Sequence, residues 1–363
     1  MSWSRILLLA ALAAATFSAA SRAADLTAGM KKGTPELKSA GPATFAPQGI
    51  LLVGDTAGAT IYAIATDDKS AGSPGQPLAI DKIDEKIAGL LGTSPKEILI
   101  NDVAVNPESG SVFLTVSRGK GPDAKPVIVR VDSSGKLGEF SLADVMFSSA
   151  PIPSAPESGR QRQEVTTDLQ FTGGQVIVAG LSNEEFASQL RVIPFPFQKV
   201  DGGASVEIWH AAHGQFETRS PVRTFAVFDV GGQPNVLAAY TCTPLVKFPL
   251  SDLKPGSKVK GTTIAELGNR NRPLDMIVYE KDGKDYLLMA NSARGVMKVD
   301  VNKIDETQGV TDHVKGGGTA GLSYDTIKDL KGVMQLDKLD KGHALLLVQS
   351  DSGSLDLKTV QLP

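Results

Sequence analysis

Short apolar runs recur along the chain, and each is followed by a small polar turn and a second run in which apolar and polar residues alternate. Alternation with a period of two is typical of a β-strand, and two such runs around a turn are typical of an antiparallel strand pair. The sequence therefore predicts a repeated strand, turn and strand. Six such units begin at Gly49, Gly110, Gly174, Asn235, Asp285 and His343.

Each unit is preceded by a shorter extended segment and a turn rich in Gly or Asp, such as DVAVNPESG and TFAVFDVGG. The repeat is thus at least three antiparallel strands, at spacings of about 50 to 65 residues, which is the scale of propeller blades. The central run of each unit is apolar on both faces, as expected of a sheet packed between two neighbours. We predict an all-β, six-bladed β-propeller over residues 24–363. Seven blades are the alternative, with the extra strands drawn from residues 66–100 or 303–332.

Two segments fall outside the repeat. Residues 80–91 place Ile and Leu at helical spacing, which predicts a short helix that packs on the end of a blade. The last unit stops at Pro363 after its third strand, and a spare segment precedes the first inner strand. We therefore expect residues 35–40 to supply the outer strand of the last blade and to close the ring. A disordered tail is the alternative for this segment.

The N-terminus has the pattern of an export signal. An arginine precedes an apolar run, and Ser21 and Ala23 form a small-x-small cleavage site, so residues 1–23 are predicted to be a signal peptide. We expect a periplasmic or secreted protein. The lone Cys242 cannot form an internal disulfide, and no other stretch is long and apolar enough to span a membrane. With 37 Lys and Arg against 40 Asp and Glu, the chain lacks the basic excess that nucleic acid selects.

Acidic residues recur at the start of the inner strands. Asp102, Asp168 and Asp275 stand at equivalent positions in three units, so a propeller would place them around one channel mouth. Three such acids repel one another unless a cation, protons or arginines offset them, and Arg223 and Arg272 are the nearest arginines. Oxygen-rich rings suit calcium or another hard divalent cation. Alternatively, each Asp accepts hydrogen bonds from backbone at the strand entrance.

Arginines and an asparagine gather in the loops and turns assigned to the same mouth. Guanidinium groups bind carboxylate or phosphate oxygens through paired hydrogen bonds, which favours an anionic small molecule as ligand. The alternative is a structural network with the aspartates. The candidate ligand-binding residues are Arg219, Arg223, Arg270, Arg272, Asn291 and Arg294.

Two histidines and the cysteine offer a different chemistry. His210 and His213 lie three residues apart in WHAAHG, and Cys242 lies in a turn of the next unit on the same face. They are candidate catalytic residues, and together they could bind copper or zinc. Cys242 would act as a nucleophile only if a histidine or an arginine lowered its pKa. The alternative is a loop in which the histidines serve packing and hydrogen bonding.

The unit count resembles that of the calcium-dependent lactonases and paraoxonase-like esterases, and of the NHL and YWTD propellers. In the lactonases, acid and Asn side chains at the inner-strand entrances hold the metal, so the resemblance implies Asn101, Asp102, Asp168 and Asp275 as metal ligands. Those enzymes also use a glutamate from an early blade, where this chain has Thr44. The likeness is therefore one of fold, which does not determine function.

The sequence leaves two functions open. The first is an exported propeller that binds an anionic small molecule or a protein at an arginine- and aspartate-rich mouth. The second is a metal-assisted hydrolase or lactonase at the same mouth, in which the aspartates hold the cation and His210 or His213 moves protons. Whether the protein is an enzyme is not decided by these residues.

Overall fold

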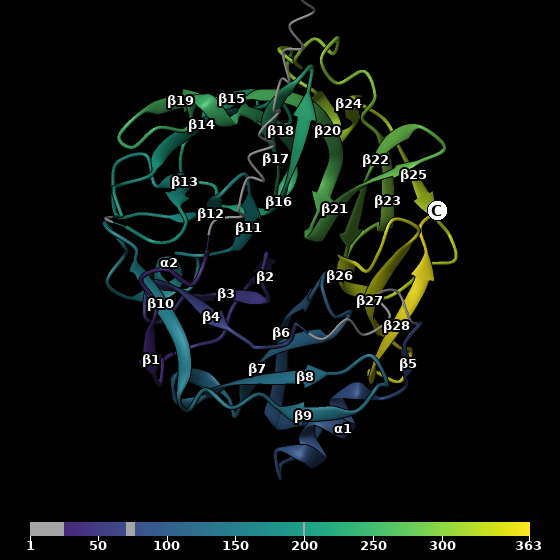
Figure 1. The fold of residues 1–363 in the computed structure, drawn as a ribbon. Coiled ribbons are helices and arrows are strands. Elements are labelled where there is room, and N and C mark those ends of the chain that lie inside the picture. The colour runs from purple at the N-terminus through teal and green to yellow at the C-terminus, as the bar shows by residue number, and fades with distance from the viewer. Residues whose placement is uncertain (1–24, 70–76, 199) are drawn as a thin grey trace, which may run out of the picture.

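Six sheets, antiparallel except for the pairing of β14 (Ala204–His210) with β19 (Lys258–Lys260), form a ring around a central channel in the computed structural model, which describes residues 25–69, 77–198 and 200–363 (Figure 1). The predicted six-bladed β-propeller is confirmed. The inner strands of the blades are β2 (Ala43–Ala46), β6 (Ile98–Val105), β11 (Asp168–Thr172), β16 (Val222–Val230), β21 (Pro273–Lys281) and β26 (Val333–Lys338). The predicted signal peptide lies outside the described residues.

Two further strands follow each inner strand in antiparallel register. The second strands are β3 (Ile50–Asp55), β7 (Val112–Arg118), β12 (Gln175–Leu181), β17 (Gln233–Tyr240), β22 (Lys284–Asn291) and β27 (His343–Gln349). The third strands are β4 (Thr60–Ala65), β8 (Lys125–Val131), β13 (Ser188–Pro194), β18 (Cys242–Pro249), β23 (Gly295–Asp300) and β28 (Leu355–Gln361). The second strands are buried along most of their length, as the apolar runs predict.

The outer edges are less regular than the first three strands. Blade 1 ends in β10 (Val145–Pro151) and β1 (Lys31–Gly33), blade 2 in β9 (Leu137–Glu139), and blade 3 in β14 (Ala204–His210) with β15 (Gln215–Glu217) and β19 (Lys258–Lys260). Blade 4 ends in β20 (Thr262–Asn271) and β24 (Thr319–Gly321), blade 5 in β25 (Tyr324–Ile327) and blade 6 in β5 (Ala79–Ile80). Residues 66–69 and 77–100 and residues 303–332 therefore complete existing blades, and no seventh blade is present among the described residues.

The blades do not follow one another around the ring in chain order. The inner strand β2 packs between β6 and β11, and β6 packs between β2 and β26. The order around the ring is therefore blade 2, 1, 3, 4, 5, 6 and back to blade 2 (Figure 1). After blade 1 the chain runs to blade 6 and adds β5, and after blade 2 it returns to blade 1 and adds β10.

The predicted closure of the ring was wrong. The outer strand of blade 6 is β5, whose Ile80 pairs with Leu357 of β28, and not residues 35–40. Those residues form a loop over the channel mouth, where Asp55 accepts hydrogen bonds from the backbone N–H of Lys38 and of Ser39, both at 2.8 Å. The buried Asp55 carboxylate holds this segment in place, so it is not available as an edge strand.

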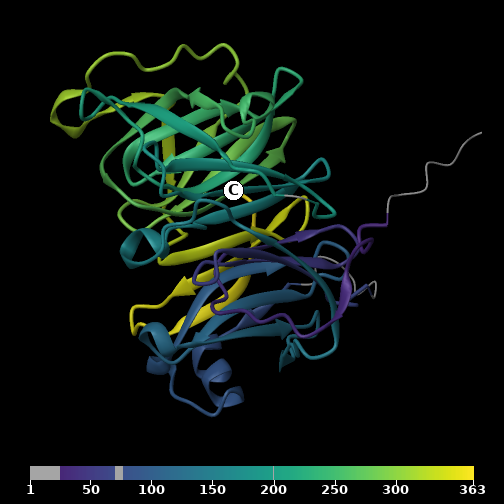
Figure 2. The same cartoon turned by 90° about the vertical axis from the view of Figure 1, so that its left-hand side faces the viewer.

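The predicted helix is present as α1 (Ile83–Leu90), which lies outside the ring beside blade 2 (Figures 1 and 2). Its Ile83 and Ile87 are fully buried in a cluster with strands of blades 2 and 6, whereas Leu90 is 43% exposed. The helix therefore covers a blade edge, as its apolar stripe predicts. A short α2 (Gly159–Arg162) leads into blade 3. No helix among the described residues is long and apolar enough to cross a membrane.

Candidate functional site

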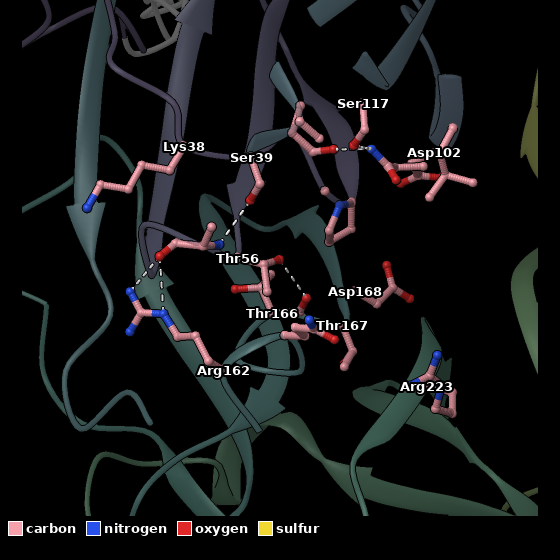
Figure 3. A pocket seen from close by; sticks show the side chains of 18 of the residues that line it. Lys38, Ser39, Thr56, Asp102, Ser117, Arg162, Thr166, Thr167, Asp168 and Arg223 are labelled. Atoms are coloured by element: carbon pink, nitrogen blue, oxygen red, sulfur yellow. Dashed lines mark hydrogen bonds between the residues drawn. The ribbon is translucent and has the colours of Figure 1, made fainter. Parts of the chain in front are cut away.

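A cavity of about 1000 Å³ lies over the channel at the end where the inner strands begin. Its lining comes from every blade, including the loop at Lys38–Pro42, the start of β6 and the segment 157–168. Figure 3 shows Asp102, Asp168 and Arg223 on one side of this cavity and Lys38 and Arg162 on the other. The predicted convergence of polar groups at one mouth is thus present in the structure.

Asp102, Asp168 and Asp275 all line this cavity. Each carboxylate accepts one hydrogen bond from the N–H of the next residue in its own strand and one from the inner strand of the neighbouring blade. The cross-blade donors are Ala43 N for Asp102 (2.7 Å), Phe225 N for Asp168 (2.8 Å) and Leu336 N for Asp275 (2.8 Å). The aspartates therefore join adjacent blades, which is the backbone role that the sequence left open.

A fourth aspartate, Asp337, repeats this arrangement deeper in the channel. Its carboxylate accepts Lys338 N at 2.6 Å and Val105 N of blade 2 at 2.7 Å. Asp337 was not among the site residues predicted from the sequence, because it lies near the end of β26 and not at its start. The signal was available in the alternation of VMQLDK, in which Asp337 faces the channel together with Gln335.

The channel aspartates are harder to ionise than ordinary carboxyls. Burial raises the pKa of Asp102 and Asp275 well above its usual range, and the charge of neighbouring aspartates adds to the rise. Burial likewise raises the pKa of Asp168 to about 7 and that of Asp337 to about 6, against hydrogen bonds from backbone that favour the charged form. No Lys or Arg among the described residues forms an ion pair with any of the four, so protons or a cation must offset their charge.

Of the six predicted ligand-binding residues, only Arg223 lines the cavity. Its guanidinium lies 3.5 Å from Glu164 Oε1 and not beside an aspartate. Arg219, Arg270 and Arg272 are exposed elsewhere on the rim.

Asn291 and Arg294 contact the turns of blades 4 and 5. The buried Asn291 amide donates to Asn271 and accepts the N–H of Ala293 at 2.9 Å, so Asn291 shapes its own turn. Arg294 donates to the Asn269 carbonyl. Neither residue is part of the cavity lining.

Two cations that were not predicted as ligand-binding residues also line the cavity. Lys38 lies on the loop held by Asp55, and its side chain is exposed. Arg162 of α2 donates from Nη2 to Ala57 O at 2.7 Å and from Nη1 to Pro156 O at 3.0 Å. Their position depends on segments from three distant parts of the chain, which the blade repeat does not reveal.

Asn101 also lines the cavity, next to Asp102. Its amide nitrogen donates to Ala40 O at 2.7 Å and to Ser117 Oγ at 2.9 Å. Asn101 thereby ties the start of β6 to the 35–40 loop, and its amide oxygen is left for the cavity.

The structure brings His210, His213 and Cys242 together at the junction of blades 3 and 4. One potential ligand atom from each lies within 4.8 Å of the others, although none of the three lines the channel cavity. Burial raises the pKa of the Cys242 thiol, and Glu266 raises it further. This direction opposes the activation that a nucleophile requires. The catalytic roles of the three residues stay predictions.

Comparisons with known proteins show the fold alone. No family model and no curated protein matches the chain. Among solved structures, it is similar to a PQQ-bound aldose sugar dehydrogenase from Streptomyces coelicolor (12% identity, 91% of this chain and 96% of that chain, TM-score 0.38). It is also similar to a putative oxidoreductase (glucose dehydrogenase) from Thermus thermophilus (12% identity, 92% and 100%, TM-score 0.37) and to a streptogramin B lyase (8%, 92% and 97%, TM-score 0.30). At this distance they carry no argument about chemistry.

Proposed function

We propose that the protein binds a small anionic molecule at the channel mouth, over a divalent cation that Asp102, Asp168 and Asp275 hold. The observation that supports this most is the set of three carboxyl groups that line one cavity without a cationic side chain paired to any of them among the described residues. Burying like charges is unfavourable unless a proton or a cation offsets them. Calcium is the favoured cation because the donors are oxygens.

The residues present fit such a cation. Each carboxylate oxygen accepts a backbone N–H and retains a second lone pair. The buried Thr166 hydroxyl lines the same cavity and has no hydrogen-bond partner among the described residues, and the Thr224 hydroxyl lies beside the Asp168 carboxyl. Oxygen donors of this kind suit hard cations and not the softer transition metals.

The anionic part of the proposal depends on the positive side chains at the rim. Arg223 lies on the same side of the cavity as Asp102 and Asp168, and Lys38 and Arg162 line the opposite side, so an anion in the cavity could contact a rim cation and the divalent cation at the same time (Figure 3). A volume of about 1000 Å³ is at the upper end of the range of about 300–1000 Å³ that small-molecule sites occupy. A protein partner that inserted an acidic side chain into the cavity would contact the same rim cations and the same divalent cation.

Thermal unfolding with and without calcium tests the cation. We expect calcium to raise the melting temperature near neutral pH, since an ion that binds only the folded state stabilises it by mass action. The stabilisation should be lost in Asp102→Asn and Asp275→Asn and retained in Asp229→Asn, an exposed aspartate at the far end of blade 4. An unchanged melting temperature of the parent protein in calcium would overturn the cation site.

The anion is tested by adding citrate or phosphate to the calcium-loaded protein. Either probe should bind, and Arg223→Ala should weaken its binding several-fold while leaving calcium binding intact. Arg219→Ala, at an exposed site outside the cavity, is the control. If citrate or phosphate bound equally well to Arg223→Ala and to this control, Arg223 would not be part of the anion site.

A metal-assisted hydrolase is the second candidate, and one observation favours it. In the metal-free protein, burial raises the pKa of Asp168 in the cavity to about 7, which is the range of an effective general base. In this candidate Asp102 and Asp275 would hold the cation and leave Asp168 free to act as the base. His210 and His213 do not line the cavity, so proton transfer there would depend on Asp168. Hydrolysis of simple esters or lactones that is lost in Asp168→Asn and kept in His213→Ala would support this candidate. No turnover by the calcium-loaded parent would exclude these substrates.

We also propose that residues 1–23 direct export, so that the mature protein is periplasmic or secreted. The support is the sequence pattern alone. Mass spectrometry of the protein from the extracellular or periplasmic fraction should find the chain beginning after Ala23. A cytoplasmic chain that retains residue 1 would contradict export.

A further inference from the structure

A second cluster of metal-binding side chains lies away from the channel cavity, where blade 3 meets blade 4. His210 ends β14, His213 lies in the turn before β15, and Cys242 begins β18 of the next blade. The imidazole rings of the two histidines lie against each other, with centroids 3.8 Å apart and ring planes tilted by 38°. Potential ligand atoms of all three residues lie within 4.8 Å of one another.

The turn that follows β14 places the second histidine over the first. His213 N and Gly214 N both donate to the His210 carbonyl, at 3.0 and 2.9 Å. Gly214 has a φ of 64°, and a Cβ there would lie 3.0 Å from the ring of His313. A side chain at this position would therefore be strained and crowded, so the tight turn that pairs the histidines depends on glycine.

Glu217 orients both imidazoles. Its Oε1 lies 2.6 Å from His213 Nδ1 and 2.9 Å from His210 Nδ1, and Ser220 Oγ donates to Oε2 at 2.7 Å. Burial raises the pKa of Glu217, but these contacts outweigh burial and bring the pKa well below its usual value. A carboxylate that fixes the ring orientation of histidines is a common outer partner of metal ligands.

One buried carboxylate oxygen beside the cluster lacks a partner among the described residues. Glu266 is fully buried, and its Oε1 accepts Ala211 N at 2.7 Å while its Oε2 has no partner. The buried His210 has Glu217 Oε1 2.9 Å from its Nδ1 and Thr243 Oγ1 2.8 Å from its Nε2, so a metal ion on Nε2 would take the place of the threonine contact. Unpartnered buried groups are costly. A bound cation would offset the charge of Glu266.

Cys242 is held in an unusual backbone conformation. Its φ is 91°, a region that residues other than glycine rarely adopt, and the pairing of β18 with β20 is irregular between Cys242 and Pro244. The Sγ atom lies 3.9 Å from Asn269 Oδ1 and also interacts with the Thr243 side chain and the Arg270 backbone. Strain of this kind is typical of functional sites, where it holds a side chain in a required direction.

We propose that His210, His213 and Cys242 together bind one transition-metal ion, zinc or copper, with Glu217 as the residue that orients the imidazoles. Two imidazoles and a thiolate are borderline to soft ligands, which select these metals over calcium or magnesium. Because the thiol must lose its proton, binding releases a proton and strengthens as pH rises. This site is separate from the cation proposed for the channel and does not depend on it.

The test uses the full-length protein stripped of metal and titrated with Zn(II) or Cu(II) against a chromophoric chelator. We expect one ion per chain. Cys242→Ser and His213→Ala should each weaken binding by about 10- to 100-fold or more, and Glu217→Gln by about 10-fold. His343→Ala changes a histidine at the start of β27 in blade 6, outside the cluster, and should leave metal binding unchanged. Asp102→Asn should also leave this site intact, which separates it from the channel cation.

Spectroscopy distinguishes the two metals and identifies the thiolate. Copper should give a visible thiolate charge-transfer band that Cys242→Ser abolishes, and cobalt in place of zinc should give strong thiolate-dependent bands. The His213 side chain is 48% exposed, so His213→Ala is expected to fold even if a change at the buried His210 does not. Ion content and affinity that are equal in the parent, Cys242→Ser and His213→Ala would overturn the site and leave a hydrogen-bonded cluster.

Discussion

Replacing Asp168 by Asn should flatten the dependence of stability on pH. The folded protein holds a proton on Asp168 up to about pH 7, whereas the unfolded chain releases it near the ordinary value of 3.8. Between these values the folded state binds more protons than the unfolded state, so this residue lowers the free energy of unfolding as pH rises. The difference between a pKa of about 7 in the folded protein and 3.8 in the unfolded chain corresponds to about 4 kcal/mol, and screening by solvent in the channel reduces this to about 2–4 kcal/mol.

The variant also loses a hydrogen-bond acceptor. Asp168 accepts Leu169 N and Phe225 N through different oxygens, and an amide can accept only one of them. We therefore expect Asp168→Asn to be less stable than the parent by about 1 kcal/mol at about pH 4. At about pH 8 it should equal or exceed the parent, because the buried charge is gone.

Urea denaturation in the presence of a chelator measures both effects. The free energies of unfolding of parent and variant are compared at several values between about pH 4 and pH 8, where the difference should change by about 2–4 kcal/mol. Asp229→Asn makes the same chemical change at the exposed end of β16, and its free energy of unfolding should depend on pH as that of the parent does. Parallel curves for Asp168→Asn and the parent would refute the raised pKa and with it the electrostatic account of the channel.

Three further changes test other parts of the structure. Ile87→Ala should cost about 2–5 kcal/mol in urea denaturation because Ile87 is fully buried, whereas Leu90→Ala on the same helix should cost less than about 0.5 kcal/mol. Equal costs would show that α1 does not pack as described. Arg223→Ala should cost less than about 1 kcal/mol, since its ion pair with Glu164 is a half-exposed contact. A loss of several kcal/mol would indicate pairing with the channel aspartates. Asp275→Ala should cost about 1–3 kcal/mol at low pH through the lost link between blades 5 and 6, and no cost would contradict that link.

Much of the fold could be predicted from the sequence because each blade is built from local strand pairs. The apolar alternation that begins at Gly49 and at Asp285 specifies the hairpins of blades 1 and 5, and these hairpins recur in the structure. The order of the blades could not be predicted in this way. Exchange of the outer strands β5 and β10 depends on contacts between distant segments, which leave no periodic signal in the sequence.

In the candidate sites, too, some residues could be placed from the sequence and others depend on contacts between distant segments. Asp102, Asp168 and Asp275 could be placed around one mouth because each stands near the start of an inner strand, and the inner strands of a propeller begin at the same end of the channel. The register shifts beside Asp102 and Asp275 could not be predicted from the alternation of side chains. The arginines could not be placed, because a loop residue at the mouth can face the cavity, as Arg223 does, or solvent, as Arg272 does. The positions of loop side chains depend on tertiary contacts such as the one between Arg162 and Ala57.

The most direct test of the channel proposal is the proton balance of calcium binding. Titration calorimetry at about pH 6.5, in buffers of different ionisation enthalpy, counts the protons that leave the protein when calcium binds. Burial raises the pKa of Asp168 to about 7 and also raises the pKa of Asp102 and Asp275, so a cation that binds these carboxylates should displace protons from the channel. The account predicts that calcium binds saturably and releases protons, and that Asp102→Asn abolishes this proton release. Binding without proton release, or no binding heat in any buffer, would contradict a cation shared by these three aspartates.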